Sequence, residues 1–155
     1  MGDEPQLPSD IVLLAPVPYQ HLVSGLITCE REGKVAFGTN STAPLELEVN
    51  LKGGSCPVLI FASETPFAGP PRVSWAAQFI RCSHAKRGRH EHGETYRPAT
   101  TVTDGDWALF WEVSDLHPLT GEDALPISSL RPAGKKTKYA KIFVPHGPLL
   151  IDTPY

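Results

Sequence analysis

Alternating hydrophobic and polar positions divide the chain into short apolar segments, and the three strongest lie between positions 57 and 113. In residues 72–82 and 107–113, apolar and polar side chains alternate with a period of two, which indicates β-strands. Residues 57–63 are apolar throughout, as expected of a central strand that is covered on both faces. We therefore predict that these segments form the middle of a sheet, and they contain all three tryptophans of the protein.

The remaining pattern predicts shorter elements around this sheet. Apolar residues recur at spacings of three and four over residues 19–32, which predicts an amphipathic helix that ends at Gly33. Further short strands are expected at residues 11–15, 34–38, 45–51, 100–102 and 139–144, with one helical turn at 126–130. Residues 1–9 are expected to be a flexible lead and residues 10–155 a single domain. Six or seven short strands with one early helix predict an α+β fold, a small, partly closed, mixed or antiparallel β-barrel.

Two connections between these elements are basic. Residues 83–98 lack hydrophobic periodicity, and a loop of this length in a compact domain is usually mobile or functional. Residues 131–138 form a second basic loop. The net charge is −3, yet ten of the fourteen lysines and arginines lie in residues 81–97 and 131–141. Because salt confines the field of a charge to about 8 Å, a local basic face can still bind a polyanion.

The cysteines and the apolar runs of the sequence indicate the cellular compartment in which the protein is expected. The three cysteines, Cys29, Cys56 and Cys82, are far apart and form no Cys-x-x-Cys pair, which predicts reduced thiols of a cytoplasmic protein. No apolar run approaches the roughly 20 residues that span a bilayer, so no membrane partner is expected. Residues 11–17 follow acidic rather than basic residues, so we expect no signal peptide.

The order of these segments resembles the PUA-like superfamily, and most of all the EVE domain. The resemblance rests on Val-Ala-Phe-Gly at 35–38 after the early helix, Val-Leu-Ile-Phe-Ala-Ser at 58–63, the long strand at 73–81, Tyr96-Arg97-Pro98 before 107–113, Pro-Ile-x-x-Leu at 126–130, and Gly147-Pro148. The chain departs from the family at positions 70–72, where Pro-Pro-Arg replaces the usual glycine. The resemblance implies a reader of DNA or RNA that flips a modified base, such as a methylated one, into an aromatic pocket. It also implies a nuclease or other effector subunit as a partner, and no cofactor.

The residues that would serve such a pocket fall into two sets. The base-binding set contains Trp75, Trp107, Trp111, Phe61 and Tyr96 for stacking, with Ser63 and Asp104 or Asp106 for the base edge. The phosphate set contains Arg81, Lys86, Arg87, Arg89, Arg97, Lys135, Lys136 and Lys138. Tryptophans on alternating strands are also ordinary core residues, and exposed cations are ordinary surface charges, so both interpretations stay open.

A metal site, an enzyme and a protein-interaction module are the alternatives to a nucleic-acid reader. His84, His90 and His92 are secondary candidates for a metal site, but five nearby cations would repel a divalent ion, so no metal is expected. The ASCH branch of the same superfamily contains hydrolases of modified nucleosides. Its Gly-x-Lys-x-x-Glu-x-Arg signature is absent here, and there is no nucleophile elbow or phosphate-binding glycine loop, so an enzyme is the less favoured alternative. A protein-interaction module of a defence or phage system is a third alternative.

Overall fold

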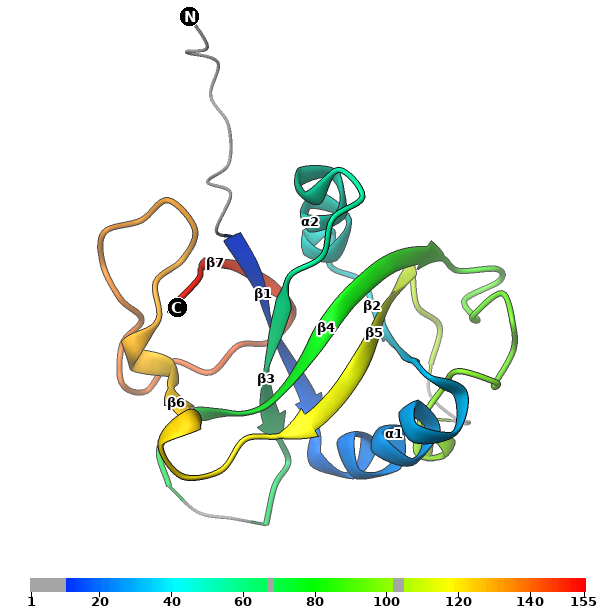
Figure 1. The fold of residues 1–155 in the computed structure, drawn as a ribbon, viewed down its shortest axis with the longest axis horizontal. Coiled ribbons are helices and arrows are strands. Elements are labelled where there is room, and N and C mark those ends of the chain that lie inside the picture. Colours follow the sequence, from blue (N-terminus) through cyan, green and yellow to red (C-terminus); the bar gives the residue numbers. More distant parts are fainter. Residues whose placement is uncertain (1–10, 67–68, 102–104) are drawn as a thin grey trace, which may run out of the picture.

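The computed structural model describes residues 11–66, 69–101 and 105–155. The predicted lead at 1–9 lies outside these residues. The described chain forms an α+β fold in which a seven-stranded mixed sheet is accompanied by two α-helices (Figure 1). The elements are β1 (Ile11–Pro18), α1 (Tyr19–Glu32), β2 (Val35–Thr39), α2 (Ala43–Leu51), β3 (Pro57–Ser63), β4 (Arg72–His84), β5 (Leu109–Pro118), β6 (Leu125–Pro126) and β7 (Leu149–Asp152). Short 3₁₀ turns lie at Ala99–Thr101, Gly121–Asp123 and Ile127–Ser129. None of the described helices has the length and apolar character needed to span a membrane.

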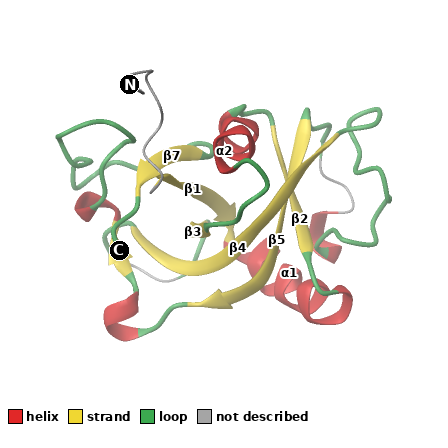
Figure 2. Cartoon of the chain, turned by 45° about the horizontal axis from the view of Figure 1, so that its top comes forward, coloured by secondary structure: helices red, strands yellow, loops and turns green. Residues whose placement is uncertain are grey.

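The sheet follows the order β2-β5-β4-β3-β1-β7, with β6 paired to one end of β4. Strands β1 and β3 run parallel, and the other pairs are antiparallel. Strand β4 is the longest, and its register against β5 shifts twice along its length. Such bulges bend a strand and increase its twist, and Figures 1 and 2 show a strongly curved sheet.

The expected closure into a barrel is wrong, because β2 and β7 stand at opposite ends of the strand order and do not pair. The outer edge of β2 bonds instead to the long loop after β4. Ala36 N–H donates to the Tyr96 carbonyl at 2.7 Å, and Arg97 Nη1 donates to the Ala36 carbonyl at 2.8 Å. At the other side, α2 contacts β1, β4 and β7. The edge of β7 bonds to residues 131–133: the Asp152 N–H donates to the Arg131 carbonyl and the Ala133 N–H to the Leu150 carbonyl, both at 3.1 Å. Loop segments therefore occupy the edges of β2 and β7 where further strand pairing would close the sheet.

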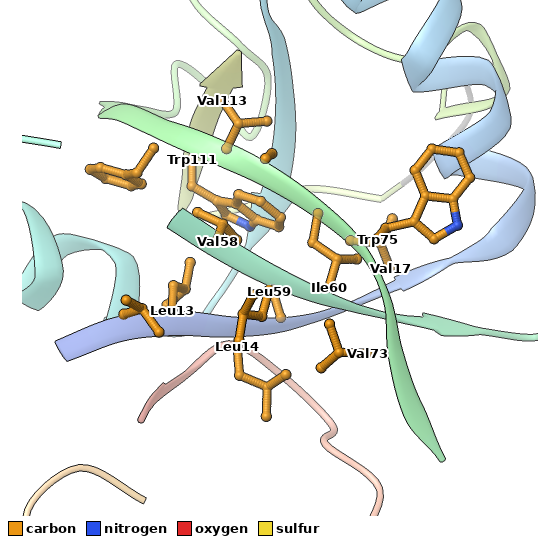
Figure 3. Packing of buried hydrophobic residues seen from close by; sticks show 14 of the residues in the cluster. Leu13, Leu14, Val17, Val58, Leu59, Ile60, Val73, Trp75, Trp111 and Val113 are labelled. Carbon is orange, nitrogen blue, oxygen red and sulfur yellow. The ribbon is translucent and has the colours of Figure 1, made fainter. Parts of the chain in front are cut away.

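The core lies inside this curved sheet (Figure 3). Residues 11–15 of β1 and 58–60 of β3 are buried without a break, which is the pattern of strands covered on both faces. Trp111 and Val113 of β5 belong to this cluster, and so does Trp75 of β4, which Figure 3 shows at one side of it, apart from Trp111. The three segments that the sequence predicts as the middle of a sheet are indeed β3, β4 and β5.

The helix predicted at 19–32 is confirmed as α1. Gly33 adopts φ 84° at its C-cap, and its N–H donates to the Cys29 carbonyl at 2.8 Å. The left-handed conformation is easy only for glycine, which is why the helix ends there.

The strand predicted at 45–51 is wrong, because this segment is helix α2. Pro44 lies in the first turn, where its fixed φ favours a helix. Leu47 and Ala43 are buried, four residues apart, while Val49 is 71% exposed. The apolar residues therefore follow a helical spacing, and their strict alternation along the sequence is misleading.

Three smaller expectations also fail. Residues 99–101 form a 3₁₀ turn instead of a strand, and position 102 lies outside the described residues. Strand β5 begins at Leu109, so Trp107 precedes the strand and does not share a strand face with Trp111. Residues 139–144 form no strand, and within them Tyr139 and Phe143 stack on each other with ring centroids 4.4 Å apart. The last strand is β7 instead.

Candidate functional site

A cavity of about 550 Å³ opens where the end of β1, the first turn of α1 and strand β2 meet the segments around Trp107 and His146. We call it the Trp107 cavity. Its apolar lining includes Phe37, Trp107 and Trp111, and its polar lining includes Asn40 and Arg97. A cavity of this volume is within the range of small-molecule sites, about 300–1,000 Å³.

Trp107 forms a wall that the backbone holds in place. Its backbone N–H donates to the Gly88 carbonyl at 3.1 Å, and the backbone N–H of Ala108 donates to Asn40 Oδ1 at 2.9 Å. The indole lies directly on Gly38 of β2, where a Cβ atom would be 2.4 Å from ring atoms Cδ1 and Cγ. Only glycine at position 38 allows this approach. The wall is therefore built by β2, the segment that leads into β5 and the loop after β4 together.

The inner end of the cavity is aromatic. Phe37 and Trp111 are opposite each other on β2 and β5, with ring centroids 4.9 Å apart. Trp111 is 1% exposed. Among the described residues, no acceptor lies within hydrogen-bond distance of the buried indole N–H of either Trp107 or Trp111. A buried donor without a partner costs free energy, so two of them in one cavity are notable.

Arg97 connects this cavity with a second one of about 330 Å³, which we call the Arg89 cavity. Arg97 and Trp107 line both. Arg97 is 9% exposed, donates to the Ala36 carbonyl and lies 4.9 Å from the ring centre of Phe110. Its guanidinium is therefore fixed in the partition between the two cavities, and it is not a surface cation of the loop.

A buried carboxylate anchors the long loop. Glu112 of β5 is fully buried and contacts three basic side chains: Lys34 Nζ at 2.8 Å, His90 Nε2 at 2.9 Å and Arg81 Nε at 3.3 Å. Burial alone raises the pKa of Glu112, but hydrogen bonds from His90 and Lys34, with the charge of Lys34, outweigh it and hold the pKa well below its usual range. Glu112 is therefore ionised at neutral pH.

The same network fixes Tyr96 and the histidines. Lys34 Nζ lies 4.5 Å from the ring centre of Tyr96, which also makes edge contacts with His90 and His92. The His92 N–H donates to His90 Nδ1, so His90 donates through Nε2 to Glu112. Both ring nitrogens of His90 are thus in use. In the described part of the chain, no three His, Cys, Asp or Glu side chains gather as a metal-binding group, and this includes the candidates His84, His90 and His92.

The structure divides the predicted base-binding set. Trp75 and Phe61 line a third cavity of about 570 Å³ with Tyr19 and Leu119, which we call the Trp75 cleft. Tyr96, Ser63 and Asp106 line none of these three cavities; the Asp106 side chain lies against Gly88. The single pocket expected from the sequence is thus two cavities, and Trp107 and Trp111 are the members that the fold brings together. Asp104 lies outside the described residues.

The predicted phosphate contacts do not form one face. Arg81 is bonded to Glu112 and to Glu91 at 2.7 Å. Lys86, Arg87 and Arg89 form an exposed turn beside the Arg89 cavity, closed by a bridge between Lys86 and Arg89. Lys135, Lys136 and Lys138 lie in the connection after β6, at the opposite end of the molecule from the loop after β4 in both ribbon views (Figures 1 and 2). The turn at 86–89 is therefore the only predicted cationic group in the described chain that is both exposed and next to the Trp107 wall.

Several lining residues of the Trp107 cavity were not expected: His21, Gly38, Asn40, His146 and Pro148. Gly38 belongs to the Val-Ala-Phe-Gly segment, where a glycine interrupts an apolar strand pattern. That interruption is the one sequence signal that points to a close approach. His21 lies in α1, Asn40 in the connection after β2, and His146 and Pro148 in the connection before β7, so no local pattern relates them.

Comparison with models of known protein families finds none that matches this chain, and comparison with curated proteins finds no significantly similar sequence. The site is therefore interpreted from its own geometry.

Proposed function

We propose that this protein binds DNA or RNA and receives one flipped, modified base in the Trp107 cavity. The observation that carries the proposal is the wall itself. A partly exposed indole is held on Gly38 at the side of a cavity whose inner end is aromatic. A flipped base needs a flat apolar surface on which to stack and polar groups for its edge.

A reader of nucleic acid also needs cations for the phosphates, and the surroundings of the wall supply them. The Gly88 carbonyl bonds to Trp107, so the turn that carries Lys86, Arg87 and Arg89 is joined to the cavity wall. Phosphates flanking a flipped base would lie within reach of this turn. Each phosphate neutralised adds about one unit to the slope of log affinity against log salt.

The proposal is tested with fluorescence anisotropy of labelled single-stranded oligonucleotides that contain one modified base. Stacking on an aromatic residue contributes about 1–3 kcal/mol per base, so Trp107→Leu is expected to weaken binding about 5- to 150-fold. Trp75→Leu is the matched control, since Trp75 lines a different cavity, and its affinity should stay near the wild-type value.

A double variant, Lys86→Ala with Arg87→Ala, is expected to reduce the salt slope by about two. The proposal is wrong if no oligonucleotide binds at low salt, or if Trp75→Leu removes binding while Trp107→Leu keeps it. Turnover of a modified nucleoside in the same samples, detected by mass spectrometry, would favour the hydrolase alternative instead.

A further inference from the structure

The last connection of the chain, residues 131–148, joins the second basic loop to the lining of the Trp107 cavity. Its final residues His146, Gly147 and Pro148 line that cavity, and the Ser41 hydroxyl donates to the Pro148 carbonyl at 3.2 Å. Earlier in the same connection lie lysines at positions 135, 136, 138 and 141, which we call the lysine segment. One continuous stretch of backbone therefore leads from a group of cations to the cavity.

The lysine segment is strongly positive, and the protein does not neutralise it. Residues 131–148 contain no aspartate or glutamate. All four lysines are exposed, and none of them forms an ion pair with a carboxylate of the described chain, whereas Arg131 of the same connection lies 3.7 Å from Asp152. Their charges are therefore available to an anionic partner outside the protein.

The core holds the backbone of this segment in place and leaves one aliphatic side chain outside. The Tyr139 N–H donates to the Leu130 carbonyl at 2.9 Å, and the Tyr139 and Phe143 rings stack against the core, 4.4 Å apart. Ile142, next to Lys141, is 88% exposed. An unpaired base has an apolar face that can pack on such a side chain, whereas the bases of a duplex are stacked on each other. The surface therefore fits a single strand better than a duplex.

We propose that the lysine segment binds the single strand that leaves the Trp107 cavity, on the side of the flipped base away from the turn at 86–89. The inference rests on the proposed function and deepens it, because it defines the path of the strand. Trp107 is bonded to the turn at 86–89, and His146 lies in the connection that carries the lysines. The two cationic groups lie at opposite ends of the molecule (Figures 1 and 2), so they contact opposite flanks of the flipped base.

The length of the connection sets how long the bound strand must be. An extended chain spans at most about 3.6 Å per residue, so Lys141 lies within about 18 Å of His146, and Lys135 within about 40 Å. A stacked strand advances about 3.4 Å per nucleotide. Lys141 is therefore reached within about five nucleotides of the flipped base, and the whole segment within about twelve.

The test is fluorescence anisotropy with two series of labelled single-stranded oligonucleotides. The modified base is at the 5′ end in one series and at the 3′ end in the other, and each series has tails of about two and about twelve nucleotides. Only one series directs its tail toward the lysine segment. In that series, the longer tail is expected to raise the slope of log affinity against log salt by about three, because four contacts to a single strand contribute about 0.7 each.

Three variants assign the effect to the lysines. Lys135→Gln, combined with the same change at the other three positions of the segment, should remove the increase in slope and keep the affinity for the short oligonucleotides. Lys86→Ala with Arg87→Ala should lower the slope for the long tail of the other series instead. Lys52→Gln is the matched control, since Lys52 is an exposed lysine outside both groups, and should change neither slope.

Equal slopes for short and long tails in both series, or an unchanged slope in the lysine variant, overturn the inference while the base cavity stands. Long oligonucleotides whose binding depends on the lysines but not on Trp107 overturn the base cavity and keep the lysine surface. Equal affinity for the long oligonucleotide and its duplex removes the preference for a single strand. Vesicles of phosphatidylcholine and phosphatidylserine test the other anionic surface: if the lysine variant loses vesicle binding and keeps its oligonucleotide binding, the segment binds a membrane and the inference is overturned.

Discussion

The contact between Trp107 and Gly38 makes Gly38→Ala the sharpest test of how the cavity wall is built. A methyl group at position 38 would lie 2.4 Å from two indole carbons and 2.7 Å from the indole nitrogen. Non-bonded carbon atoms pack about 3.5–4.0 Å apart, so the ring would have to retreat by roughly 1 Å or more. The backbone resists this movement, since the backbone N–H groups of Trp107 and Ala108 donate to the Gly88 carbonyl and to Asn40 Oδ1.

Overpacking of this kind costs about 1–3 kcal/mol. For a domain of this size, Gly38→Ala should lower Tm by about 2–12 °C. The displaced ring also loses its position in the cavity, so the affinity for the modified oligonucleotide should fall as in Trp107→Leu. Thermal unfolding followed by circular dichroism measures the change in Tm, and anisotropy measures the change in affinity.

Two comparisons isolate the contact. Gly147 lines the same cavity, but nothing lies within 4 Å of a Cβ atom built there, so Gly147→Ala should change stability by less than about 1 kcal/mol. In a Trp107→Ala background the clash is gone, and Gly38→Ala should then cost almost nothing, a strong coupling in a double-mutant cycle. Equal stability of the Gly38→Ala and Gly147→Ala proteins, or an unchanged cost without Trp107, would refute the reasoning.

Other parts of the fold give further predictions. Glu112→Gln removes a charge that Lys34 and Arg81 share, and should cost about 3 kcal/mol at pH 7, the low end for buried pairs because both cations are partly exposed. The pKa of Glu112 is lower in the folded state, so its stabilisation is full above the unfolded pKa of about 4.3 and fades as pH falls further. Urea unfolding between pH 7 and pH 3 should show this loss in the wild type and a flatter profile in the variant; parallel profiles would contradict it. Gly33→Ala should cost about 1 kcal/mol through its left-handed conformation alone, and no loss in thermal unfolding would contradict that. Burial raises the pKa of Cys56 to about 11, and burial with the charges of nearby carboxylates raises that of Cys82 to about 12, so both should resist iodoacetamide at pH 8 until the protein is unfolded; rapid alkylation of the folded protein would argue against this.

Local patterns predict the elements of this fold well where one chemical reason dominates. Helix α1 has three- and four-residue spacing and a glycine stop, and both of its ends were predictable. Strands β3 and β4 are apolar or alternating over a long run. Alternation predicts a strand where helix α2 forms, because the even spacing of its leucines imitates a strand. The helix forms because Leu and Glu favour helices and Pro44 lies in its first turn.

Contacts between residues far apart in the sequence decide that the sheet does not close into a barrel, and they decide where the site lies. Glu112 looks like an ordinary polar residue of an alternating strand, and only the fold shows that it is buried with Lys34 and His90. That network turns the loop after β4 into a fixed cover for the edge of β2. Likewise, Trp107 and Trp75 have similar sequence surroundings, yet the fold puts them in separate cavities. Sequence alone identifies the tryptophans as candidates but cannot choose between them.

The placement of a base in the Trp107 cavity is tested most directly by photocrosslinking. An oligonucleotide with 5-iodocytosine at the modified position is irradiated in complex with the protein, and the crosslinked residue is identified by mass spectrometry. The crosslink is expected at Trp107, Trp111 or Phe37, the aromatic residues of that cavity. A crosslink at Trp75 or Phe61 would place the base in the other cleft, and one confined to residues 131–141 would place the nucleic acid on the opposite basic loop. Either result would contradict the proposed site.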